Sequence, residues 1–361
     1  MRILVAPDKF AGTLTAVEAA EAIAAGWRRH APDDDLVLVP MSDGGPGFVD
    51  VLHASLGGDL LAVVAEAPQG HEVPATILKV DDTVYIESAQ ACGVHLTGGR
   101  LGEFGTTVGV GQLLLEAVNA GATRVVVGLG GSGTNDGGAG LLAALGADAD
   151  VALDVGAVFL DGITTVDLSI ARGLVDGVEI VAATDVDNPL TGLFGASKTF
   201  GAQKGIDEEM QVILDGYLER FAAATDRRLS LEPGAGAGGG LGFAIMLLGG
   251  HRVPGIGLVA DAVGLAEQAR TADLVITGEG AFDFSSRAGK VPAGVAAIAA
   301  DALRPCVALA GRVLVGSREM RALGMDAAYA LVDAVGEERA LGDPAGSLAE
   351  LAARVARTWS D

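Results

Sequence analysis

The chain has 361 residues, of which 50% are hydrophobic and only 4% aromatic, and its formal net charge is −23. A single hydrophobic core rarely extends over a chain of this length, so we expect two domains. The strong negative charge would repel nucleic acid and anionic membranes, and we expect neither as a partner.

The cysteines and the N-terminal residues indicate where the protein works. Cys92 and Cys306 are far apart and lack the spacing of a zinc site, so we expect reduced thiols, as in the cytoplasm. The apolar run over residues 1–7 is too short for a signal peptide, and Asp8 and Lys9 follow it directly. These features predict a cytoplasmic protein.

Strand, loop and helix signals alternate from the beginning of the chain. Residues 2–7 read as a strand, and Thr15 with Glu18 three positions later has the spacing of a capping box that opens a helix. A second strand over residues 36–40 leads into a glycine turn and a helix over residues 46–56. This succession is typical of an α/β unit.

The same succession returns near the other end of the chain. Strands are expected over residues 273–277, 306–310 and 327–332, with a helix after Pro292. The segments between the two ends include strands over 75–80, 83–87, 124–128 and 179–184 and a helix over 107–120. We expect an α/β fold with two domains. Residues 1–67 and 255–361 would form a doubly wound parallel-sheet domain, and residues 68–254 an inserted α/β domain.

The most informative segment is RVVVGLGGSGTNDGGAG at residues 124–140, where an apolar run ends in glycines. Glycine allows positive φ and close approach, so consecutive backbone N–H groups can point at one anion. The segment therefore suggests a phosphate cradle over Gly130, Gly131, Ser132, Thr134 and Asn135. A carboxylate beside it, Asp136, suggests a cation.

Acidic residues recur in turns at the expected strand ends. They are Asp8, Asp43, Asp136, Asp185 with neighbouring Asp187 and Asn188, and Glu279 with Asp283. Carboxylates at several strand ends suit magnesium and phosphoryl transfer, although each one alone also fits a helix cap or a turn. Lys290 either meets phosphate at a helix start or is a solvated lysine.

Two further segments have two interpretations each. The turn at Asn188-Pro189 either aims Asp185 and Asn188 at a ligand or only reverses the chain. The glycine run over residues 234–242 either cradles a nucleotide or permits close helix packing, and we favour the nucleotide.

Other motifs of small-molecule chemistry are weak or missing. Gly128, Gly130 and Gly133 match GxGxxG, but polar residues stand where a dinucleotide-binding helix should begin. The Walker A loop and the protein-kinase signatures are absent. The five histidines show neither metal-ligand spacing nor a serine partner, which disfavours a zinc hydrolase and a catalytic triad.

Seven motifs in a fixed order make the chain resemble the bacterial type I glycerate kinases. They are APDKFAGTLTA at Ala6, PMSDGGPG at Pro40, GLGGSGTNDGGAG at Gly128, ATDVDNPL at Ala183, FGAQKG at Phe200, PGAGAGGGLG at Pro233 and TGEGAFDFSSRAGK at Thr277. The resemblance implies a flavodoxin-like first domain and ATP-dependent, Mg²⁺-assisted phosphorylation of D-glycerate. The bacterial members favour 2-phosphoglycerate over 3-phosphoglycerate as the product.

We hypothesise roles for individual residues, partly from their match to the family's motifs and partly from their own chemistry. The catalytic residues would be Asp185, Asp283 and Lys290, with one of the two aspartates as the base. Glycerate would contact Asp8, Lys9, Thr106, Thr107, Asn188 and Arg287. Nucleotide and phosphate would contact Gly130, Gly131, Ser132, Thr134, Asn135, Gly236, Gly238 and Gly239, and magnesium would contact Asp43, Asp136 and Glu279.

The chain departs from the family pattern at four positions. The family often has lysine at Ala11, glutamate at Pro46, proline at Ala202 and arginine at Ala281. The lost cations leave two alternatives open: a kinase of a related hydroxy acid, and a noncatalytic binder of small acids or nucleotides. A nicotinamide dehydrogenase would rest on the weak glycine motif alone. A homodimer is compatible with the sequence.

Overall fold

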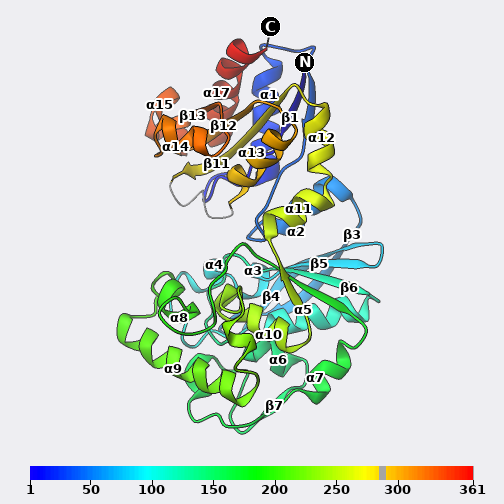
Figure 1. The fold of residues 1–361 in the computed structure, drawn as a ribbon, viewed down its shortest axis with the longest axis vertical. Coiled ribbons are helices and arrows are strands. Elements are labelled where there is room, and N and C mark those ends of the chain that lie inside the picture. Colours follow the sequence, from blue (N-terminus) through cyan, green and yellow to red (C-terminus); the bar gives the residue numbers. More distant parts are fainter. Residues whose placement is uncertain (284–289, 361) are drawn as a thin grey trace. The chain divides into compact units, whose positions relative to one another are not determined.

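The computed structural model describes residues 1–283 and 290–360. The chain separates into two compact units (Figure 1). Unit 1 consists of Met1–Asp43, Asp50–Gly57 and Ile256–Asp361, so it contains segments from both ends of the chain. Unit 2 consists of Gly44–Val49 and Gly58–Gly255.

Unit 1 contains a sheet of five parallel strands in the order β13-β12-β11-β1-β2. Its strands are β1 (Arg2–Val5), β2 (Asp35–Leu38), β11 (Leu274–Phe282), β12 (Cys306–Val313) and β13 (Ala327–Ala330). Strand β1 pairs with β2 on one side and with the central strand β11 on the other, and Val5 lies opposite both Leu38 and Ile276. Counted along the unit, this is the 2-1-3-4-5 order of flavodoxin-like sheets, which confirms the α/β fold class.

The helices of unit 1 connect these strands. They are α1 (Ala16–Arg28), most of α2 (Phe48–Leu56), α11 (Gly255–Ala262), α12 (Leu265–Thr271), α13 (Val291–Asp301), α14 (Ser317–Ala322), α15 (Leu331–Val335), α16 (Glu337–Gly342) and α17 (Pro344–Trp359). Helix α1 begins with the predicted capping box: Glu18 N–H donates to the Thr15 hydroxyl, and Thr15 N–H donates to the Glu18 carboxylate. Helices α1 and α17 lie side by side (Figure 1), and both contribute to the core over β1 and β11.

Unit 2 contains a mixed six-stranded sheet in the order β10-β9-β6-β5-β4-β3. Its strands are β3 (Asp59–Glu66), β4 (Glu72–Val80), β5 (Thr83–Glu87), β6 (Arg124–Gly128), β9 (Glu179–Ala183) and β10 (His251–Val253). The four strands from β5 to β10 are parallel, whereas β4 and β3 are antiparallel to their neighbours. A separate antiparallel pair consists of β7 (Asp148–Ala149) and β8 (Val166–Asp167).

Helices surround this second sheet. They are α3 (Ala89–Cys92), α4 (Val94–Thr97), α5 (Val108–Asn119), α6 (Ala139–Ala144), α7 (Ser169–Leu174), α8 (Ala196–Phe200), α9 (Glu208–Ala224) and α10 (Leu241–Leu247), with 3₁₀ turns at Ala157–Leu160, Ala202–Lys204, Leu229–Leu231 and Ala237–Gly239. The core of unit 2 joins the central strands to α5, α6 and α10.

Several elements differ from the sequence expectation. The strand expected over residues 273–277 extends to Phe282, so Glu279, which was expected in a turn, lies within β11. The short strands β7, β8 and β10 were not predicted. Strand β3 was not predicted, because its DLLAVVAE sequence lacks regular alternation and most of its side chains are exposed or half-buried. The strand expected over residues 327–332 ends at Ala330, and α15 begins with Leu331. The structure groups β3 with unit 2, ahead of the domain boundary expected after residue 67. The expected domain boundaries themselves stay a prediction.

Candidate functional site

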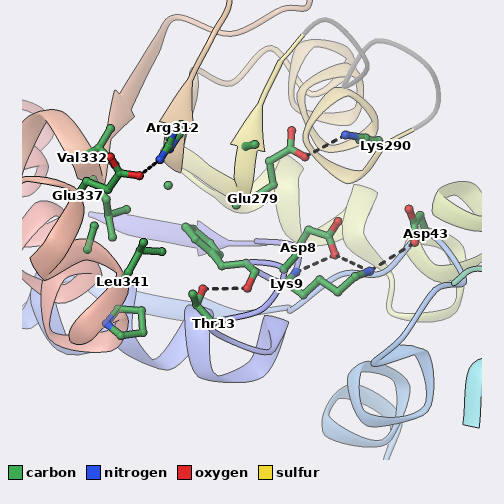
Figure 2. Close-up of a pocket in the computed structure, with 18 residues that line it drawn as sticks. Asp8, Lys9, Thr13, Asp43, Glu279, Lys290, Arg312, Val332, Glu337 and Leu341 are labelled. Carbon is green, nitrogen blue, oxygen red and sulfur yellow. Dashed lines mark hydrogen bonds and ion pairs between the residues drawn. The ribbon is translucent and has the colours of Figure 1, made fainter. Parts of the chain in front are cut away.

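A cavity of about 400 Å³ in unit 1 is the first candidate site (Figure 2). Its walls come from the loop after β1, the carboxyl-terminal parts of β11 and β12, and helices α15, α16 and α17. Strands β1 and β11 flank the topological switch point of this sheet, where the order in which the chain adds strands reverses. Ligands of doubly wound sheets bind at this switch point, beyond the carboxyl ends of the strands.

One end of the cavity carries two lysines, each between two carboxylates. Lys9 Nζ lies 3.8 Å from Asp8 Oδ1 and 3.9 Å from Asp43 Oδ1. Lys290 Nζ lies 3.8 Å from Glu279 Oε2 (Figure 2), and 3.9 Å from Asp283 Oδ1. These distances are ion-pair distances and exceed those of a direct hydrogen bond.

Asp8 is a buried carboxyl group whose pKa is shifted. Burial raises the pKa of Asp8 to about 7, and the nearby carboxylates of Asp43 and Glu279 act in the same direction. The charge of Lys9 and its backbone N–H, which donates to Asp8 Oδ1 at 2.7 Å, oppose this rise. A carboxyl group that titrates near neutral pH is suited to exchange protons with a substrate.

The other end of the cavity is mainly apolar. It is lined by Leu331, Val332, Ala340, Leu341 and Pro344 from the three C-terminal helices. Figure 2 shows Val332 and Leu341 on the opposite side of the cavity from Asp43 and Lys290, with an ion pair between Arg312 and Glu337 beside them. The cavity therefore has an apolar end and a charged end.

The floor of the cavity depends on glycine. A Cβ on Gly311 would lie 2.3 Å from the carbonyl oxygen of Gly280, and one on Gly280 would lie 3.1 Å from the backbone nitrogen of Ala11. Ala11 and Ala281, where the family pattern often has a cation, also line the cavity. Among residues 1–283 and 290–360, the positive charges of the charged end therefore come from Lys9 and Lys290.

In unit 2, the loop after β6 is organised around Asp136, which is fully buried. Its Oδ2 accepts hydrogen bonds from the backbone N–H and the hydroxyl of Thr107 and from Gly140 N–H, while its Oδ1 accepts from Gly138 N–H. Burial raises the pKa of Asp136, and these hydrogen bonds oppose the rise. Asp136 therefore holds this loop in place from the inside. The Thr107 hydroxyl is already engaged, because it donates to the Asp136 carboxylate.

The polar residues before Asp136 face the interior of unit 2. Thr134 N–H donates to the Ser132 hydroxyl, which also donates to the carbonyl of Gly238 at 3.1 Å. Asn135 donates to the hydroxyl of Ser197 at 2.8 Å, whereas its buried Oδ1 has no hydrogen-bond partner within the described part of the chain. Thr106 is buried too, and its hydroxyl accepts a long hydrogen bond from the backbone of residue 108.

The glycine run serves close packing in this structure. A Cβ on Gly236 would lie 2.2 Å from the carbonyl oxygen of Pro189, and one on Gly239 would lie 2.0 Å from that of Thr134. The Asn188 side chain donates to the carbonyl of Phe194 at 2.7 Å. This geometry favours the packing interpretation of the run and the turn interpretation of Asn188.

The structure thus distributes the predicted residues over the two units. Asp8, Lys9, Asp43, Glu279, Asp283 and Lys290 come together in unit 1. Thr106, Thr107, Gly130, Gly131, Ser132, Thr134, Asn135, Asp136, Asp185, Asn188, Gly236, Gly238 and Gly239 belong to unit 2. Arg287 lies outside the described residues. The functional role of each residue stays a prediction.

The sequence interpretation missed Lys204, which is 1% exposed. Its ammonium donates to the carbonyl of Thr134, and burial lowers its pKa to about 8. Such a lysine holds the phosphate-cradle segment to the 3₁₀ turn at residues 202–204. The FGAQKG motif contained this residue, but only its place in the motif distinguished it from a surface lysine.

The described part of the chain lacks two kinds of feature, a clustered set of metal ligands and a membrane-spanning helix. Residues 1–283 and 290–360 contain no group of three or more His, Cys, Asp or Glu side chains spaced to hold a metal ion. Over the same residues, no helix combines the length and the apolar character needed to cross a bilayer.

Comparisons with known proteins agree with the fold. The model of the "Glycerate kinase family" matches residues 3–360. The chain is 40% identical to an uncharacterized protein of Mycobacterium bovis over 99% of this chain and 91% of the relative. It is 38% identical to the glycerate 2-kinase of Escherichia coli K12, over 93% of this chain and 92% of the relative.

A solved structure extends the agreement to three dimensions. The protein named glycerate kinase 2 from Salmonella typhimurium LT2 superposes with a TM-score of 0.83 at 36% identity, over 99% of this chain and 98% of that chain. Family, curated relatives and structural neighbour agree over nearly the whole length. The chain therefore belongs to the glycerate kinase family and is a phosphoryl-transferring enzyme.

Proposed function

We propose that the protein transfers the γ-phosphoryl group of ATP to D-glycerate, with Mg²⁺, and forms 2-phosphoglycerate. The observation that carries the proposal is the placement of Lys9 and Lys290 at the switch point of the unit 1 sheet, each between two carboxylates. Phosphoryl transfer depends mainly on positioning and on neutralising the charge of the phosphates, and lysines with magnesium supply both.

The donor chemistry at this end suits a divalent cation. Four carboxyl groups, those of Asp8, Asp43, Glu279 and Asp283, lie there within 4 Å of a lysine ammonium. Mg²⁺ at phosphoryl-transfer sites takes one or two protein carboxylates and completes its coordination with phosphate oxygens and water. The donor set fits this pattern, and we assign Asp43 and Glu279 to the metal. Bound Mg²⁺ would neutralise charge that develops on the transferring group.

The remaining residues of the charged end have roles that follow from their chemistry. Lys290 would hold the transferring phosphate, since it is the N-cap residue of α13 and a helix N-terminus favours a bound anion. Asp283 of this end, or Asp185 of unit 2, would accept the proton of the glycerate hydroxyl, and Asp8 and Lys9 would orient the substrates. For Asp136, whose oxygens already accept four hydrogen bonds, we propose a structural role in its loop in place of metal binding.

A direct assay tests the reaction and its product. Purified protein is incubated with ATP, Mg²⁺ and D-glycerate, and the product is coupled to enolase either directly or through phosphoglycerate mutase. Signal with enolase alone supports 2-phosphoglycerate. Signal that requires the mutase would show transfer to the 3-hydroxyl, and no signal in either arm would refute a glycerate kinase of this kind.

The metal assignment has its own test. Asp43→Asn and Glu279→Gln should raise the Mg²⁺ concentration needed for half-maximal rate by about tenfold or more, because each removes a charged ligand. Asp136→Asn should instead lower the melting temperature in the presence of EDTA, because it weakens a buried hydrogen-bond network. An unchanged Mg²⁺ dependence in the first two variants would remove both residues from the metal site.

The cellular location and the assembly are also proposals. Both cysteines are buried and free, which fits a reducing compartment such as the cytoplasm. A homodimer stays a prediction, and size-exclusion chromatography with light scattering would test it.

A further inference from the structure

The unit 1 cavity is elongated, with a charged end and an apolar end. Its charged end lies after β1 and β11, and its apolar end is lined by residues of α15, α16 and α17. The strands that line it run from β1 through β11 to β12, and neighbouring strands are about 4.8 Å apart, so these two steps alone span roughly 10 Å. A three-carbon acid such as glycerate is too short to reach from one end to the other.

The residues that line the cavity limit which kind of ligand could fill its length. One terminus must be polyanionic, because Lys9 and Lys290 stand at the charged end with carboxylates that favour a bound cation. The other terminus must be flat or apolar enough to cover Val332, Leu341 and Pro344. A volume of about 400 Å³ is within the usual range for sites that bind cofactor-sized ligands.

We propose that the apolar end of this cavity binds the base of the nucleotide, and that the phosphate chain runs along the ends of β12 and β11 to Lys9 and Lys290. This inference rests on the proposed use of ATP and adds the location of the nucleoside. It moves nucleotide recognition from the glycine run of unit 2 to helices α15 and α16 of unit 1.

The exposure of Leu341 is consistent with this assignment. Leu341 is 61% exposed although it is a large apolar residue on the wall of a cavity. A bound base would cover it and gain apolar contact area. Leu314, which is 66% exposed and does not line the cavity, provides a matched control.

The experiment measures binding by isothermal titration calorimetry on the full chain. The probes are Mg-ADP, which has a base, and Mg-tripolyphosphate, which has none. Leu341→Gln and Val332→Thr should each weaken Mg-ADP by about fivefold or more and leave tripolyphosphate within about twofold of wild type, because they remove apolar contact without changing charge. Leu314→Gln should leave both probes within about twofold.

Several results would overturn the inference. One is that the wild-type protein does not bind Mg-ADP. Another is that Leu341→Gln and Val332→Thr both bind Mg-ADP with wild-type affinity. A third is that these variants lose affinity for tripolyphosphate by the same factor as for Mg-ADP. The reaction assay separates this inference from the proposed function. Product formation with unchanged nucleotide binding in the variants refutes only the base site, whereas base-dependent binding without any product refutes only the glycerate kinase reaction.

Discussion

Asp8→Asn should stabilise the protein at alkaline pH, because the wild-type carboxylate is buried. Burial raises the pKa of Asp8 from 3.8 to about 7. The folded protein therefore favours the protonated acid. The contribution of Asp8 to the free energy of unfolding is fully present below pH 3.8 and is lost as the pH rises through 7. Asparagine has a similar shape and can still accept the hydrogen bond that Lys9 N–H donates at 2.7 Å.

The magnitude follows from the pKa difference. Each pKa unit corresponds to about 1.4 kcal/mol, so the advantage of the variant should grow by about 3 kcal/mol from pH 5 to pH 8.5 and approach a ceiling of about 4 kcal/mol. Urea unfolding of both proteins at several pH values, in the presence of EDTA, gives this difference directly.

The control is Asp150→Asn. Hydrogen bonds from Thr164 and Thr165 lower the pKa of Asp150, so this carboxyl group is ionised in both the folded and the unfolded state above pH 5. Its stability difference from wild type should be flat over the same pH range. A flat difference for Asp8→Asn as well would refute the claim that burial controls its titration.

Two further predictions concern the packing of each unit. Gly26→Ala should destabilise the protein by about 2 kcal/mol or more in thermal or urea unfolding, because its Cβ would lie 1.9 Å from the backbone oxygen of Ala349 in α17. Gly216→Ala in α9, where nothing lies within 4 Å, should stabilise by about 0.5–1 kcal/mol, and equal effects of the two changes would contradict this packing. Burial raises the pKa of the Cys92 and Cys306 thiols to about 12, so iodoacetamide should label them about 100-fold more slowly in native than in unfolded protein. Mass spectrometry of both cysteines measures this ratio, and rapid native labelling would show that they are accessible.

Local sequence signals predicted much of the architecture. The capping pair Thr15 and Glu18 and the strand-loop-helix succession are each encoded within a few residues. Because parallel strands present their carboxyl ends at one edge of a sheet, Asp8 and Glu279 were expected near each other, and the structure places both on one cavity.

Features that depend on contacts between distant segments were not predicted. Lys204 resembles a surface lysine in sequence, and only the folded unit shows that it is buried against Thr134. The apolar end of the cavity comes from short helices, where residues such as Leu341 show no pattern that distinguishes a ligand-binding wall from ordinary packing. The metal and substrate assignments stay predictions, because they depend on ligands and not on the fold alone.

The pairing of β1 has a consequence for the order in which the units fold. On one side β1 pairs with β2, about thirty residues later, but its other partner is β11, which follows after more than two hundred residues. Nearly all of unit 2 comes from the continuous segment Gly58–Gly255. Closing an unfolded segment of that length costs about 5 kcal/mol of chain entropy. A folded unit 2 removes most of this cost, because it fixes the distance between its own two ends. Unit 2 should therefore fold first, and the pairing of β1 with β11 that completes the sheet of unit 1 should follow.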